Sequence, residues 1–76
     1  MELIERVWRL RHEHSGRVLS AGLYVHPHGI EVRCGYSDEE NLLMSQVMQT
    51  PEGAQALADD WKRLVIARGF VEVKVG

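Results

Sequence analysis

The fold is decided by residues 18–37, which read VLSAGLYVHPHGIEVRCGYS. Apolar and polar residues alternate in both halves of this stretch, as is typical of half-buried β-strands. The HPHG segment between them predicts a tight turn, because its proline is preset for the first corner of a type I turn. A turn centred there places Leu23 opposite Val32 and Ala21 opposite Cys34, so both apolar sets lie on one face. We therefore predict strands over residues 18–26 and 30–37.

The preceding residues predict a third strand over residues 4–13. Apolar side chains again alternate there, and Ser15-Gly16 suits a two-residue loop. That loop would set Leu10 opposite Ala21 and Trp8 opposite Leu23, on the same apolar face. Residues 42–49 fit either a helix or a two-sided strand, and we favour a fourth strand.

A helix is predicted from Pro51 to Arg68. Thr50 is a good N-cap, proline suits the first helical position, and the following glutamate complements the positive end of the helix dipole. Gly69 suits the left-handed position after the helix. A short final strand follows and could lie antiparallel to the first, either within the chain or in a neighbouring copy.

These elements predict a single α+β domain over residues 1–76. It is an antiparallel meander of three or four strands, with one long amphipathic helix on one face and a short last strand (ββββαβ). The predicted core comprises Trp8, Leu10, Leu19, Leu23, Val25, Ile30, Val32, Cys34, Leu57, Trp61 and Leu64.

The composition restricts the function. Nine Lys and Arg face eleven Asp and Glu, so the basic excess usual in nucleic-acid-binding proteins is absent. The first residues do not read as a signal peptide, and no apolar run approaches the roughly 18 residues of a membrane span. A single cysteine fits a reducing compartment. We expect a cytoplasmic protein that does not enter membranes.

Reactive groups do not converge in the sequence. The pairs His12/His14 and His26/His28 are the only hint of a metal site, but the predicted strands separate the pairs widely. Cys34 falls on the apolar face, where a buried thiol is expected. The acidic residues read as solvated surface, and no phosphate-binding loop occurs. We expect no catalytic residues, no metal and no cofactor.

The second face of the sheet carries the candidate binding residues. Arg9, Arg11, Tyr24 and Arg33 are expected there with Val7 and Glu31, around Ser20, Gly22 and Gly35. Arginine and tyrosine suit stacking and phosphate contact, and both are frequent in protein interfaces. A solvated face with cross-strand ion pairs is the alternative.

The order of elements resembles the sheet-and-helix domain of HicB-type antitoxins. The likeness is carried by Thr50, Glu52, Ala54 and Ala58, which begin the helix. The glycine and aromatic pattern of that family's strands is absent here, so no residue roles are transferred.

The sequence favours a small non-enzymatic binding or interaction module that acts as a homodimer. A short chain without disulfides gains from association, and Phe70, Val71, Val73 and Val75 form a β-prone segment that could pair at the dimer edge. One alternative is a nucleic-acid-binding or antitoxin-like regulator that uses the arginines. Another is an enzyme whose site is assembled across a dimer interface.

Overall fold

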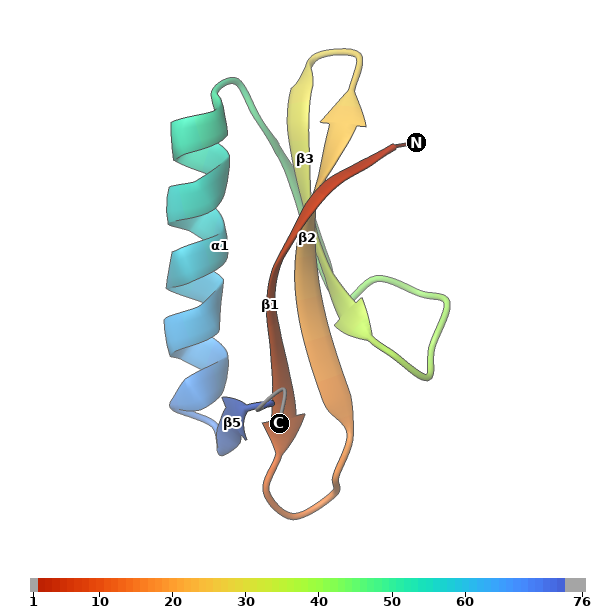
Figure 1. Ribbon diagram of the computed structural model, residues 1–76, viewed down its shortest axis with the longest axis vertical. Coiled ribbons are helices and arrows are strands. Elements are labelled where there is room, and N and C mark those ends of the chain that lie inside the picture. Colours follow the sequence, from red (N-terminus) through yellow and green to blue (C-terminus); the bar gives the residue numbers. More distant parts are fainter. Residues whose placement is uncertain (1, 74–76) are drawn as a thin grey trace.

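The computed structural model describes residues 2–73. The elements are β1 (Leu3–His12), β2 (Val18–His26), β3 (Gly29–Tyr36), β4 (Met44–Met48), α1 (Pro51–Ile66) and β5 (Phe70–Glu72). They form one antiparallel sheet in the order β4-β3-β2-β1-β5. Figure 1 shows α1 along one face of this sheet, while the loop between β3 and β4 projects on the other side. The predicted α+β fold and its ββββαβ order are confirmed, and residues 42–49 contain a strand.

The pairing of β2 with β3 agrees residue for residue with the prediction, but that of β1 with β2 does not. Leu10 lies opposite Leu19, and Trp8 lies opposite Ala21. The cause is a longer connection, because the N–H of His12 donates to the carbonyl of Arg17 at 2.9 Å. Residues 13–17 connect the two strands, instead of Ser15-Gly16 alone. The predicted register is thus wrong by two residues, a shift that leaves each side chain on its expected face.

Two irregularities in the first half of β1 change the face of the sheet on which its side chains lie. The register slips between Leu3 and Glu5 and again between Arg6 and Trp8, which is the effect of an extra residue at a β-bulge. As a result, Arg6 lies opposite Gly22. We call the side of the sheet away from α1 the outer face, and Arg6 belongs to it.

Local signals fix both ends of the helix. The Thr50 hydroxyl accepts a hydrogen bond from the N–H of Gly53 at 3.0 Å, and a proline stands in the first turn. The helix ends at Ile66, two residues before the predicted end, and Gly69 follows with a φ of +96°. This glycine turns the chain back, so that β5 pairs antiparallel with residues 10–12 of β1. The described part of the last strand therefore pairs within its own chain.

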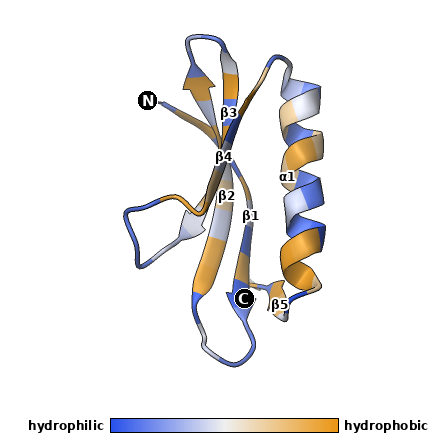
Figure 2. Cartoon of the chain, turned by 180° about the vertical axis from the view of Figure 1, so that it is seen from behind, coloured by the Kyte–Doolittle hydropathy of each residue, from blue (hydrophilic) through white to orange (hydrophobic). Residues whose placement is uncertain are grey.

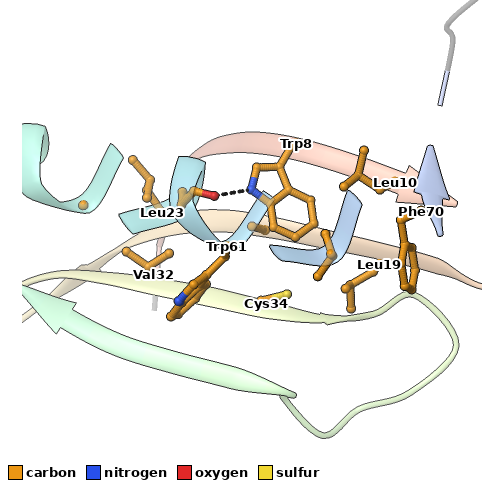
Figure 3. Close-up of a cluster of buried hydrophobic side chains, with 12 residues drawn as sticks. Trp8, Leu10, Leu19, Leu23, Val32, Cys34, Trp61 and Phe70 are labelled. Atoms are coloured by element: carbon orange, nitrogen blue, oxygen red, sulfur yellow. Dashed lines mark hydrogen bonds between the residues drawn. The ribbon is translucent and has the colours of Figure 1, made fainter. Parts of the chain in front are cut away.

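The core lies between α1 and the sheet (Figure 3). Its buried members are Trp8, Leu10, Leu19, Ala21, Leu23, Val32, Cys34, Ala54, Ala58, Trp61, Val65 and Phe70. The indole N–H of Trp8 donates to the carbonyl of Ala58 at 2.7 Å. Because the small alanines face the sheet, the helix contacts it along Ala54, Ala58, Trp61 and Val65.

Two predicted core residues lie largely in solvent. Leu64 is 57% exposed because it stands beside the buried stripe of α1. Val25 is 47% exposed near the end of β2. Ile30 and Leu57 are partly buried at the periphery of the core.

Candidate functional site

The four predicted binding residues lie on the outer face. Arg9 stands opposite Ser20, Arg11 opposite Val18, Tyr24 opposite Glu31, and Arg33 opposite Gly22. Each alternates along its strand with buried residues that face α1. Val7, which was also expected there, instead packs against the core, because the bulge beside Trp8 interrupts the alternation.

Tyr24 and Arg33 form one contact within this face. The Arg33 guanidinium carbon lies 4.7 Å from the centre of the Tyr24 ring. The same side chain makes an ion pair of 2.9 Å with Glu31, and both partners are largely shielded from solvent. Glu31 and Arg33 both belong to β3, so this ion pair lies within one strand and differs from the cross-strand pairs expected in the alternative.

A small polar cavity of about 200 Å³ lies over Gly22 and Gly35. Its wall includes Tyr24, Arg33, residues 39–42 of the projecting loop, and Arg6. The Arg6 guanidinium donates to the Ser20 hydroxyl at 3.2 Å. Sequence reasoning missed Arg6, because a single extra residue in a strand leaves no mark in an alternating pattern.

The projecting loop is anchored by Arg17. Its guanidinium contacts the carboxylates of Asp38 at 3.1 Å and Glu39 at 2.6 Å and lies 3.8 Å from the centre of the Tyr36 ring. The hydrogen bond from Arg17 lowers the pKa of Asp38, and this pairing raises the pKa of Arg17. The anchor holds the loop that forms one wall of the cavity.

The histidine pairs stabilise turns. His12 Nδ1 accepts the backbone N–H groups of His14 and Ser15, both at 3.2 Å, and His26 Nδ1 accepts that of His28 at 3.0 Å. The His12 ring also meets Phe70 edge-on, with 5.0 Å between ring centres. Within residues 2–73, no group of three His, Cys, Asp or Glu residues could hold a metal ion.

Cys34 is fully buried, and burial raises the pKa of its thiol to about 11. The thiol therefore stays protonated at neutral pH, which makes it a poor nucleophile.

Part of the segment predicted to form the dimer edge packs and pairs within its own chain. Phe70 is 7% exposed in the core, and Val71 pairs with Arg11. The N–H of Val73 donates to the carbonyl of Arg9 at 3.2 Å, and Val75 lies outside the described residues. Their role in a dimer stays a prediction.

The opposite edge of the sheet is β4. Residues 41–50 read NLLMSQVMQT and contain no charged side chain. Leu42 and Leu43, which lead into this strand, are 47% and 54% exposed, and Figure 2 shows this part of the loop in the hydrophobic colour. On α1, Leu64 and Ile66 are exposed as well.

Comparisons of this chain with protein-family models, with curated proteins and with solved structures found no match. Across residues 2–73, α1 is the one helix, and it is too short and too polar to span a membrane.

Proposed function

We propose that this protein is a small non-enzymatic interaction module that acts as a homodimer through β4. The main support for this proposal is that β4, an edge strand of the sheet, has no charged residue. Natural sheets usually protect such edges with charges, proline or bulges. Here Met44–Met48 pairs with β3 on one side, and neither it nor its flanking residues carry a charge. An edge of this kind favours the addition of another strand.

A second copy of the chain fits this edge. Two β4 strands paired about a two-fold axis bring no like charges together, because the strand has none. An apolar groove of about 250 Å³ adjoins the edge and is lined by Leu43, Met44, Leu64, Val65 and Arg68. The same patch on both copies would cover these leucines, and such self-complementary contacts favour closed dimers.

Binding rather than catalysis is supported by what the reactive groups already do. Cys34 is buried with a raised pKa. The Nδ1 atoms of His12 and His26 accept backbone hydrogen bonds that shape turns. Asp38 and Glu39 pair with Arg17. Each group thus has a structural role.

Sedimentation of the full chain at micromolar concentration tests the dimer. We expect a dimer for the natural chain and a monomer for Gln46→Lys, because two ammonium groups would meet across the pairing. Val71→Lys is the matched control on β5 and should leave the dimer intact. A natural chain that sediments only as a monomer would contradict the proposal. A dimer lost in Val71→Lys but kept in Gln46→Lys would move the interface to β5.

The outer face supports nucleic-acid binding as a second candidate. The observation that favours it is Arg6, which adds a guanidinium beside Tyr24 at the polar cavity. Arginine contacts to phosphate should make binding fall steeply with salt. A single-stranded oligonucleotide titrated at two salt concentrations tests this candidate. Binding that Arg6→Gln and Arg33→Gln do not weaken would contradict it.

A further inference from the structure

A second groove lies between the first half of β1 and α1. It measures about 730 Å³, a volume within the usual range of ligand-binding pockets. Apolar atoms make up most of its surface. The sheet contributes Ile4, Glu5, Leu23 and Ile30, and the helix contributes Pro51, Glu52, Gln55, Ala56 and Asp59.

The charged side chains that line this groove are all acidic. Glu5, Glu52 and Asp59 are its charged lining residues, and no lysine or arginine lines it. The two helical carboxylates lie on one side of α1, because they are seven residues apart. Asp59 is oriented by Gln55, whose side-chain amide donates to it at 3.2 Å. The groove is therefore an apolar floor with an acidic rim.

The backbone beside the groove has an open side. β5 pairs with β1 over Leu10–His12, and the N–H of Val73 reaches Arg9. Among residues 2–73, no strand pairs with Leu3–Val7 on the side away from β2. In Figure 1 this half of β1 runs away from α1. Ile4 is 52% exposed there.

We propose that this groove binds an extended basic segment of a partner protein, which adds as a strand to the open side of β1. In strand addition, backbone hydrogen bonds supply affinity and pockets for alternate side chains supply specificity. Lysine or arginine side chains would lay their aliphatic stems on Ile4 and Ile30, which line the groove and are not fully buried, and bring their charges to the acidic rim. The partner is thus recognised by its charge as well as by its extended shape.

A second copy of this chain fits the groove poorly. Two-fold pairing of β1 with β1 would bring Glu5 and the acidic rim of each copy together, and like charges across strands are destabilising. The groove is also separate from β4, which forms the other edge of the sheet. The proposal is therefore independent of the homodimer.

Fluorescence anisotropy with a labelled peptide that alternates lysine and valine tests the site. A peptide that alternates glutamate and valine is the matched control. We expect the lysine peptide to bind and the glutamate peptide not to bind. Amide chemical shifts of the full chain should change over Leu3–Val7, at the open side of β1. Equal binding of both peptides, or shifts confined to β4, would overturn the proposal.

Variants that neutralise carboxylates distinguish an effect of the acidic rim from an effect of the overall charge of the protein. Glu5→Gln, Glu52→Gln and Asp59→Asn combined should weaken lysine-peptide binding by roughly tenfold, since each exposed charge pair contributes modestly. The control combines Glu13→Gln, Glu40→Gln and Asp60→Asn, three carboxylates outside the groove, and should bind nearly as the natural chain does. Equal loss in both sets would overturn the site. Ala56→Arg gives a second readout, because it fills the groove with a cation and should compete with the peptide.

Discussion

At the scale of the residue, Cys34 illustrates how burial decides chemistry. Its thiol lies in the middle of β3, opposite Ala21 on one side and Met44 on the other. Side chains from α1 cover it, because the core forms one cluster between the helix and the sheet. An ionised thiolate would lose its hydration there, so the neutral form is favoured and the pKa rises.

This raised pKa predicts a loss of stability at high pH. The thiol has a pKa of 9.0 when free and about 11 in the folded chain. Because the folded chain holds the thiol proton more tightly than the unfolded chain does, the thiol contributes its full share to folding stability below pH 9. This contribution is lost as pH rises towards 11. Urea unfolding at pH 8 and pH 10.5 measures the effect. Cys34→Ala should lack this part of the pH dependence, and an identical loss in that variant would contradict the prediction.

At the scale of the element, the loop between β3 and β4 depends on a single arginine. Arg17 immediately precedes β2, whereas Asp38 lies 21 positions further along the chain. The two meet because β2 and β3 pair over their full length. The loop and the hairpin should therefore respond together to acid.

The lowered pKa of Asp38 gives the direction of this response. The ordinary pKa of an aspartate is 3.8, and at pH values above it the ion pair stabilises the loop fully. This stabilisation is lost as pH falls through the lower pKa that Asp38 has in the folded state. A carboxyl titration by NMR should find the Asp38 midpoint below 3.8, and Arg17→Gln should return it towards that value. Arg11→Gln is the control, as this arginine lies elsewhere on the sheet. An unchanged midpoint in Arg17→Gln would refute the assignment.

At the scale of the whole molecule, a buried hydrogen bond is among the contacts that join the helix to the sheet. The chain has 76 residues, and a domain of this size has a small core and a small net stability. The bond from Trp8 to the carbonyl of Ala58 joins β1 to α1 inside this core. Changes at the layer interface should thus affect the unfolding of the entire domain.

The substitution Trp8→Phe tests the hydrogen bond between Trp8 and the carbonyl of Ala58. It removes the N–H donor and some volume, and we expect a loss of about 1–3 kcal/mol in the free energy of unfolding. For a domain of this length, each kcal/mol lowers Tm by about 4–8 °C. Trp61→Phe is a matched control, because its indole N–H has no hydrogen-bond partner within residues 2–73. A thermal melt with equal losses in both variants would attribute the effect to volume alone.

The candidate surfaces divide into those that were predictable from sequence and those that were not. Alternation placed Arg9, Arg11, Tyr24 and Arg33 on one face, because neighbouring strand residues point to opposite sides. Arg6 was not predictable, since its face depends on a bulge. The acidic groove was also not predictable, because Glu5 of β1 and Asp59 of α1 line one groove only after the helix packs against the sheet.

The sequence by itself determined the β2–β3 register and the start of α1, because both depend on neighbours along the chain: a tight turn at Pro27 and a cap at Thr50. The tertiary structure alone decided the exposure of Leu64, the outward position of Arg6 and, among residues 2–73, the open sides of β1 and β4. These features depend on how strands pair and on how the helix packs on the sheet, which involve residues far apart in the sequence. The bulge in β1 sets the face of Arg6, and the packing of α1 through Ala54, Ala58, Trp61 and Val65 leaves Leu64 beside the buried stripe.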